Sequence, residues 1–318
     1  MSLRKWFHAA IDICGALPTA LMAPLAHFQA RHGALQLPLT YRIWDQFSVS
    51  PINHHFYEPI FPLSRLAAEE HRSDLAGVAW NESGQLALLH ELLRYRDELN
   101  EIPLVGAVGT YHFANTTYGP GDGKSLYAML RQNRPQRFVE IGCGYSTLIA
   151  ARALEKNRLA GSPCDHVCID PYPPAWIPKN VELIQQPVER CGAGSVIFDL
   201  AARDILFIDS SHVLRTGGDV TFEYLELLPR LASGVLVHIH DIFLPYGYPG
   251  QWLRERRFWT EQYVVQAFLA FNSAFDVLLA THWLSRAHRD HFLAAFPALG
   301  RSEFSHRFAS AFWLRRSG

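Results

Sequence analysis

Four acidic residues stand at the ends of predicted strands, and a histidine follows one of them closely. Glu140, Asp170, Asp209 and Asp241 end or follow four apolar runs, and His212 lies three residues past Asp209. Ligands of doubly wound folds bind at the carboxyl ends of parallel strands, where these side chains would meet. Carboxylates accept hydrogen bonds from hydroxyl and amino groups, and a histidine exchanges protons near neutral pH. The pattern predicts a polar ligand site capable of acid–base chemistry.

A glycine turn within residues 138–147 is the most specific local pattern. The run Phe-Val-Glu-Ile-Gly-Cys-Gly-Tyr-Ser-Thr predicts a buried strand, a tight turn at Gly142 and Gly144, and then a helix over 146–157. Without a Cβ atom, these glycines allow the backbone to lie against a ligand. Thr147 replaces the third glycine of the dinucleotide fingerprint, which disfavours NAD. Asp170, after the next strand, is placed to accept hydrogen bonds from a ribose diol.

Four segments in this order resemble the class I S-adenosylmethionine (SAM)-dependent methyltransferases. Glu140-x-Gly142-x-Gly144 is similar to their first motif, and Asp170 is similar to their ribose acid. The Asp-x-x-His ending of residues 204–212 and the His-Asp ending of residues 234–241 resemble the small-molecule branch. The resemblance covers about residues 105–318.

The resemblance implies a set of cofactor contacts. Glu140 would face the amino-acid part of SAM, Asp170 the ribose, and Gln186 and Val188 the adenine. Aromatic faces stabilise a sulfonium cation, so Tyr118 and Tyr145 are candidates to lie beside it. The full expected cofactor set is Tyr118, Glu140, Gly142, Gly144, Tyr145, Ser146, Asp170, Gln186, Val188 and Asp209.

The same likeness implies that His212 is the base, with Asp209 and Asp241 as catalytic partners. On the acceptor side we expect Tyr246, Tyr248 and Gln262. A divalent metal is possible but not favoured, and its ligands would be Asp209, His212, His240 and Asp241.

The predicted activity is methyl transfer to a small-molecule acceptor, at oxygen first and nitrogen second. Two alternatives remain open at this point. One is an enzyme that transfers or cyclises the aminocarboxypropyl group of SAM and releases methylthioadenosine. The other is a non-catalytic SAM-binding partner subunit.

Alternating strand and helix patterns predict an α/β fold. We expect a Rossmann-like, seven-stranded, mostly parallel sheet with a reversed C-terminal hairpin. The predicted strands are 137–141, 166–170, 181–185, 204–209, 234–240, 275–283 and 310–315, and the later helices 219–231 and 258–272. Residues 1–105 are predicted to form an N-terminal helical or lid region, and residues 106–318 the methyltransferase domain.

The composition narrows the classes of partner that this protein is expected to bind. The formal charge is −1 and no long basic run occurs, so no nucleic-acid partner is expected. Five cysteines without a CxxC pair suit a reducing cytoplasm. Near the N-terminus, His8 and Asp12 interrupt the apolar run, and Pro18 and Pro24 are expected to break the helix beyond it. We therefore expect an amphipathic helix packed on the protein and no stable membrane insertion, with weak membrane-surface association left open. Oligomeric state stays unknown.

Overall fold

The computed structural model describes residues 3–52, 59–60, 74–115, 117–192, 194–296 and 309–318. The chain divides into two units, residues 1–67 with 253–258, and residues 68–252 with 259–318. The boundary expected at residue 105 therefore lies inside the larger unit. Helices α3 (Glu82–Leu92) and α4 (Arg96–Asn100) belong to that unit. Leu89, Leu92 and Leu99 explain this, because their side chains are buried in its core.

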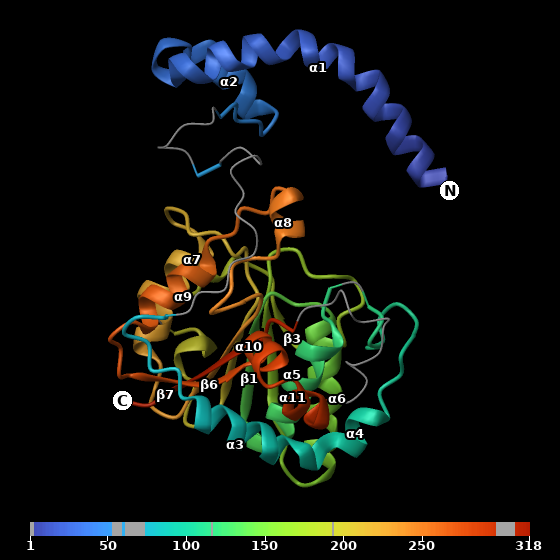
Figure 1. The fold of residues 1–318 in the computed structure, drawn as a ribbon, viewed down its shortest axis with the longest axis vertical. Coiled ribbons are helices and arrows are strands. Elements are labelled where there is room, and N and C mark those ends of the chain that lie inside the picture. The colour runs from blue at the N-terminus through green and yellow to red at the C-terminus, as the bar shows by residue number, and fades with distance from the viewer. Residues whose placement is uncertain (1–2, 53–58, 61–73, 116, 193, 297–308) are drawn as a thin grey trace. The chain divides into compact units, whose positions relative to one another are not determined.

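The larger unit is built on one seven-stranded sheet in the order β3-β2-β1-β4-β5-β7-β6 (Figure 1). All its strands are parallel except β7, which is antiparallel to β5 and β6. The strands are β1 (Arg137–Ile141), β2 (Asp165–Ile169), β3 (Glu182–Ile184), β4 (Ile205–Ile208), β5 (Leu236–Ile239), β6 (Phe275–Ala280) and β7 (Phe312–Arg316). The predicted sheet with its reversed closing hairpin is confirmed. The strand predicted over 275–283 is too long, because α10 (Thr281–Ala287) begins directly after Ala280.

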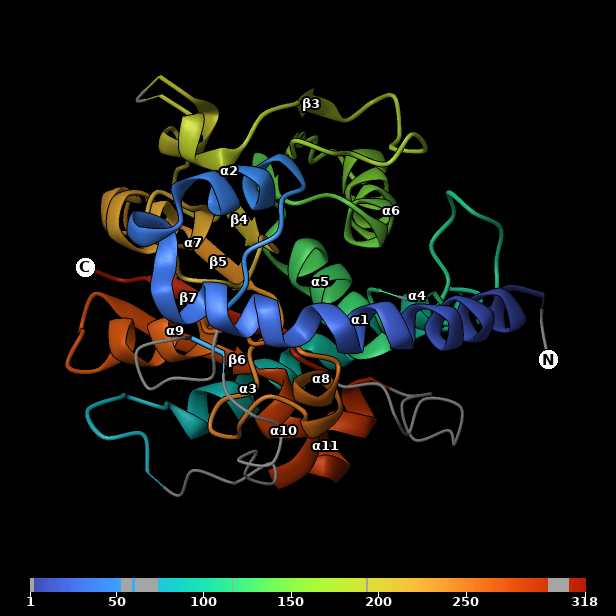
Figure 2. The same cartoon turned by 90° about the horizontal axis from the view of Figure 1, so that it is seen from above.

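Helices cover both faces of this sheet. Figure 2 shows α5 (Pro120–Asn133) and α6 (Tyr145–Leu159) on one face, and α7 (Asp219–Phe222) and α9 (Glu261–Leu269) on the other. Strands β4 and β5 are buried throughout, as parallel strands between two helical layers must be. The chain also contains the short helices α8 (Gly250–Arg254) and α11 (Arg289–Ala295).

The helix predicted over 219–231 is not regular. After α7 the chain continues as a π-helical segment, Glu223–Leu227, and a 3₁₀ turn, Leu228–Arg230. Pro229 lacks the N–H that an α-helical bond at its position requires, which accounts for the change of helix type.

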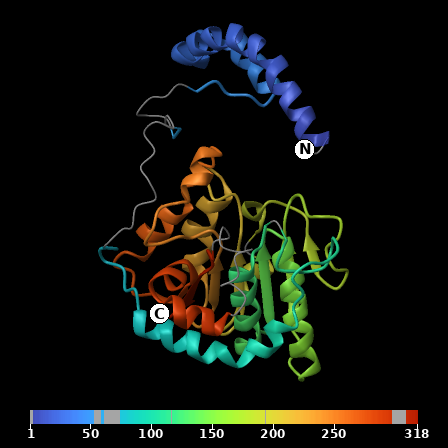
Figure 3. The same cartoon turned by 45° about the vertical axis from the view of Figure 1, so that its right-hand side comes forward.

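The smaller unit contains α1 (Leu3–Gln36) and α2 (Pro38–Gln46). The prediction that Pro18 and Pro24 end a helix is wrong, since α1 runs through both (Figure 3). Each proline removes one donor, and the remaining bonds keep the helix continuous until Gly33, whose φ of 74° kinks it. The stretch Arg4–Gln36 is long and apolar enough to cross a membrane, with a mean hydropathy of 1.5 over its most apolar window.

Candidate active site

The glycine turn lies between the carboxyl ends of three strands. The Gly142 N–H donates to the Ile169 carbonyl at 2.9 Å, and the Asp209 N–H donates to the Ile141 carbonyl at 2.9 Å. Gly142 has a φ of 82°, and a Cβ atom there would lie 2.1 Å from the Asp209 carbonyl oxygen. Glycine is therefore required for the turn itself. Gly144 differs, because no atom lies within 4 Å of its Cβ position, which leaves room for a ligand against its backbone.

Asp170 is fixed at the same edge by backbone donors. The Cys143 N–H donates to Asp170 Oδ2 at 2.9 Å, and the Tyr172 N–H donates to Oδ1 at 2.6 Å. The Cys143 thiol also donates to Oδ2 at 3.4 Å, so Oδ1 is the oxygen that keeps a further lone pair for a ligand hydroxyl. The carboxylate is thus oriented, which is what recognition of a ribose diol needs.

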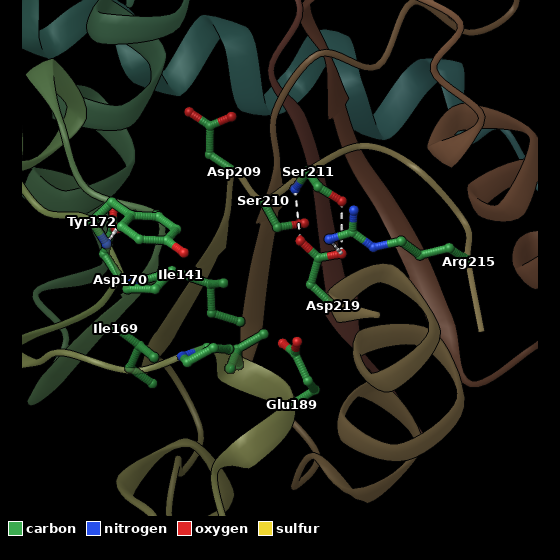
Figure 4. A pocket seen from close by; sticks show the side chains of 14 residues that line it. Ile141, Ile169, Asp170, Tyr172, Glu189, Asp209, Ser210, Ser211, Arg215 and Asp219 are labelled. Carbon is green, nitrogen blue, oxygen red and sulfur yellow. Dashed lines mark hydrogen bonds and ion pairs between the residues drawn. The ribbon is translucent and has the colours of Figure 1, made fainter. Parts of the chain in front are cut away.

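Two cavities adjoin along this edge and share Gly142, Asp170 and Asp209. Their volumes are about 440 Å³ and 320 Å³, within the range of small-molecule sites. Figure 4 shows part of the first, where Ser211 and Arg215 contact Asp219. Apolar walls of the first cavity come from Ile141, Ile169, Pro187 and Val188. The second is lined by Tyr118, Tyr145, Ser146 and Trp176 with the glycine turn.

Two residues of the expected cofactor set do not line either cavity. Glu140 is fully buried and bonds His166 Nε2 at 2.7 Å and the Cys168 thiol at 3.2 Å. The carboxylate therefore connects β1 to β2, and its ligand atoms form one buried group with those of His166 and Cys168. Gln186 donates to Cys191 Sγ at 3.4 Å instead of lining the cleft. Strand-end position alone did not reveal these buried partners.

His212 is at the centre of a charged cluster beside the cleft. Its Nε2 lies 3.2 Å from Asp209 and 3.6 Å from Asp241, and its Nδ1 lies 2.7 Å from Glu261 Oε2. The backbones of His212 and Asp241 are left-handed, with φ of 61° and 57°. Strain of this kind in non-glycine residues persists where the surrounding structure imposes it, and it is common at functional sites.

The charges in this cluster stabilise one another. Burial lowers the pKa of His212, but hydrogen bonds to Asp209 and Glu261 and the charge of Asp241 outweigh it and hold that pKa well above its usual range. Burial raises the pKa of Asp209, but the neighbouring His240 and His212 lower it by more. The pKa is therefore below its ordinary value, and this carboxyl stays ionised.

Glu261 is the functional residue whose role the sequence did not predict. It begins α9, is fully buried, and accepts a hydrogen bond from the Tyr224 hydroxyl at 2.9 Å. The Trp259 ring covers His212, with ring centroids 4.3 Å apart. The pattern indicated a helix at Glu261, but nothing in the spacing connects it to a histidine 49 residues earlier.

Comparison with known proteins identifies this arrangement. Residues 139–242, which contain the glycine turn, Asp170, Asp209, His212 and Asp241, match a family model described as a methyltransferase domain. Over these residues the chain is similar to methyltransferase domains. An uncharacterized protein of Archaeoglobus fulgidus is 29% identical over 150 residues, which are 42% of this chain and 67% of that protein.

Solved structures with partial likeness include two methyltransferases. SAH-bound PaMTH1 of Podospora anserina is 16% identical, over 72% of this chain and 88% of that chain, with a TM-score of 0.38. The O-methyltransferase TomG of Streptomyces achromogenes, in complex with SAM, is 17% identical over 76% of this chain and 92% of that chain, with a TM-score of 0.33.

The methyltransferase domain also holds donors suited to a divalent cation. Ligand atoms of Asp209, His240 and Asp241 lie within 4.8 Å of one another. His240 Nδ1 lies 3.3 Å from Asp209 and 3.5 Å from Asp241, and its Nε2 lies 3.5 Å from Asp122. Burial lowers the pKa of His240, but Asp241 and Asp209 raise it overall, so a cation would have to replace a proton.

The three residues expected on the acceptor side lie inside the larger unit. Tyr246, Tyr248 and Gln262 are all buried, and none lines the two cavities. The Gln262 N–H donates to the Tyr248 hydroxyl at 3.1 Å, and Gln262 Oε1 accepts from the Phe243 N–H at 3.2 Å. These bonds anchor the loop after β5 to the start of α9. Contact of the three residues with an acceptor stays a prediction.

Proposed function

We propose that this protein methylates the hydroxyl oxygen of a small molecule, with His212 as the base that removes the hydroxyl proton. One observation carries the proposal: Glu261 holds Nδ1 of His212, and this leaves Nε2 directed toward Asp209 at the cleft. When Nδ1–H donates to Glu261, the lone pair of a neutral imidazole is on Nε2. That tautomer is the one a base requires.

The cofactor half would work mainly by positioning. SAM supplies a methyl group that is activated by its sulfonium charge. Asp170 would bind the ribose hydroxyls, and Pro187 and Val188 would border the adenine in the larger cavity. Gly144 would let the amino-acid part approach the backbone, and Tyr118 and Tyr145 would face the sulfonium in the second cavity. Methyl transfer requires acceptor and methyl about 3 Å apart and in line, so this rigid edge contributes by orientation.

The protonation state of His212 depends on the charge around it. The three carboxylates favour the protonated imidazole, which cannot act as a base. A cation beside Asp209 offsets part of that negative charge and favours the neutral form. The SAM sulfonium is such a cation, so cofactor binding would prepare the base. A nitrogen acceptor would use the same base and is the second choice.

The first experiment identifies the adenosyl product by mass spectrometry, after purified protein is incubated with SAM and a small-molecule extract. S-adenosylhomocysteine above a no-protein control is the expected product. Methylthioadenosine instead would mean that the aminocarboxypropyl group is transferred or cyclised. If the protein formed neither product and bound SAM only when a second protein was present, it would be a non-catalytic partner subunit.

Chelation separates His212 from a cation as the activating group. Asp209, His240 and Asp241 would hold a divalent cation, which would bind and acidify the acceptor hydroxyl. If His212 suffices, turnover survives exhaustive chelation. A loss restored by Mg²⁺ or Mn²⁺ would assign activation to the cation.

We also propose that the methyltransferase domain works in the cytoplasm. Its four cysteines, Cys143, Cys164, Cys168 and Cys191, are all free thiols. Unpaired thiols suit a reducing compartment.

A further inference from the structure

One face of α1 carries large apolar side chains at helical spacing. Trp6, Ile13, Leu17, Leu21 and Phe28 follow one another at intervals of seven and four residues, so they share one side of the helix. All five are exposed, from 51% for Phe28 to 75% for Ile13. A single exposed leucine is ordinary in a water-facing protein, but a stripe of this length is not.

The opposite face of α1 has a different composition. His8, Asp12, Gly15 and Thr19 recur at intervals of four and three residues, and Ala26 continues the line. These positions hold polar or small residues, and the exposed Ile11 and Met22 lie toward the edge of this side. The helix therefore has two faces, and Asp12, which interrupts the apolar run in the sequence, is on the polar one.

Helix α2 repeats the pattern. Leu39 and Ile43 within it and Phe47 just after it are four residues apart and 72%, 57% and 73% exposed. Gln29 connects the two helices, because its side-chain oxygen accepts from Trp44 Nε1 at 3.0 Å and its carbonyl accepts from the Tyr41 hydroxyl at 3.3 Å. These contacts are polar. The described part of this unit buries none of these apolar stripes within itself.

We propose that α1 and α2 bind the surface of a phospholipid bilayer through their apolar faces and hold the methyltransferase domain there. Charge supports this partner: residues 1–52 contain Arg4, Lys5, Arg31 and Arg42 but only two acids, Asp12 and Asp45. Arg4, Lys5 and Arg31 stand near the ends of α1 and Arg42 stands within α2, where they would meet anionic headgroups. Tryptophan favours the boundary between headgroups and acyl chains, and Trp6 lies beside Arg4 and Lys5. A face of large apolar residues opposite a polar face is the pattern of a helix lying in that boundary.

Vesicle flotation with the full chain tests this proposal. Vesicles of phosphatidylcholine with phosphatidylglycerol should carry the protein to the top of a gradient. The double variant Leu17→Glu/Leu21→Glu should reduce the floated fraction by about tenfold. The matched control, Thr19→Glu/Ala23→Glu, adds the same charge to the opposite face and should float nearly as well as the wild type.

Three results would overturn the proposal. A wild-type chain that stays with the unbound protein would mean that another protein surface covers the stripe. Equal loss in both double variants would mean that the helix is surrounded by lipid and does not lie on the surface. An intact mass that shows the apolar segment removed in cells would make it a cleaved leader. S-adenosylhomocysteine binding, measured on each variant, shows that the methyltransferase domain is folded whichever result is obtained.

Discussion

The two halves of the cleft are built in opposite ways. At the ends of β1 and β2, the glycine turn and backbone N–H groups shape the site and orient one carboxylate, Asp170. At the ends of β4 and β5, side chains form a charged cluster around His212, drawn from segments as far apart as Asp209 and Glu261. The first half is local and made of backbone, whereas the second is assembled across the sheet.

This difference separates binding from chemistry. A backbone turn keeps one conformation when a ligand binds. Its N–H groups can hold the ligand without any group that titrates. A cluster of buried charges is costly to build unless every member is paired, and it can move protons. Substitutions in the two halves should therefore fail in different ways.

The largest effect is expected at His212. His212→Ala removes the proposed base, so turnover should fall by about 10²–10⁴-fold while S-adenosylhomocysteine affinity changes little. Turnover and ligand titration on the same preparation measure both. The control is His288→Ala, which also breaks a histidine–glutamate contact, since His288 Nε2 lies 2.9 Å from Glu82 Oε1. This variant should keep normal turnover. If cofactor affinity fell as far as turnover, His212 would have a role in the binding half and not a chemical one.

Glu261→Gln should have the next largest effect. An amide can accept from His212 Nδ1, but it can also present its NH₂ group and no longer balances a positive imidazole. Turnover should fall by about 10–10³-fold with unchanged cofactor affinity. The Tyr224→Phe variant removes only the second bond to Glu261, 2.9 Å long, and should lose less. Full turnover in Glu261→Gln would show that Glu261 supports the fold alone.

The two glycines test the binding half. Gly142→Ala places Cβ 2.1 Å from the Asp209 carbonyl oxygen at a φ of 82°, so the free energy of unfolding should fall by about 2–3 kcal/mol. Gly144→Ala meets no atom within 4 Å and should leave stability unchanged while it weakens SAM binding. Thermal denaturation and SAM titration of both variants distinguish the cases. Unchanged SAM affinity in Gly144→Ala would place the ligand away from this backbone.

The sequence predicted the binding half better than the catalytic half. Gly142, Gly144 and Asp170 lie in short segments whose geometry follows from neighbouring residues, so their positions could be predicted. Glu140 was predicted at the cleft because it ends a strand, but its partners His166 and Cys168 come from the next strand. Glu261 contacts His212 across 49 residues, and only the folded sheet brings them together.

Tyr145 gives a smaller effect that separates cation binding from packing. Its ring lines the second cavity beside Trp176, with centroids 5.3 Å apart. Tyr145→Leu should weaken SAM binding by about two- to fivefold, the equivalent of one exposed cation–π contact. S-adenosylhomocysteine lacks the sulfonium charge, so its affinity should change less. Equal losses for both ligands, as Trp176→Leu should give, would reduce Tyr145 to a packing residue.

The smallest effect is expected at an acid outside both halves. Glu98 accepts from Arg131 Nε at 2.8 Å and from the Tyr127 hydroxyl at 2.6 Å. The hydrogen bond from Arg131 lowers the pKa of Glu98 below its ordinary value of 4.5, although burial opposes this. A carboxyl whose pKa is lowered by folding stabilises the protein above its unfolded pKa and loses that contribution as pH falls through the folded value.

Glu98→Gln should therefore lower the free energy of unfolding by about 1 kcal/mol at neutral pH, and by less in acid below the pKa of the carboxyl. Urea denaturation of both proteins across this range measures the difference. Turnover should stay normal, in contrast to Glu261→Gln, because the Glu98 cluster touches neither cavity. A stability difference independent of pH would mean that the lost contribution is the shape of the side chain. Glu98 would then differ from Glu261, whose proposed role depends on its charge.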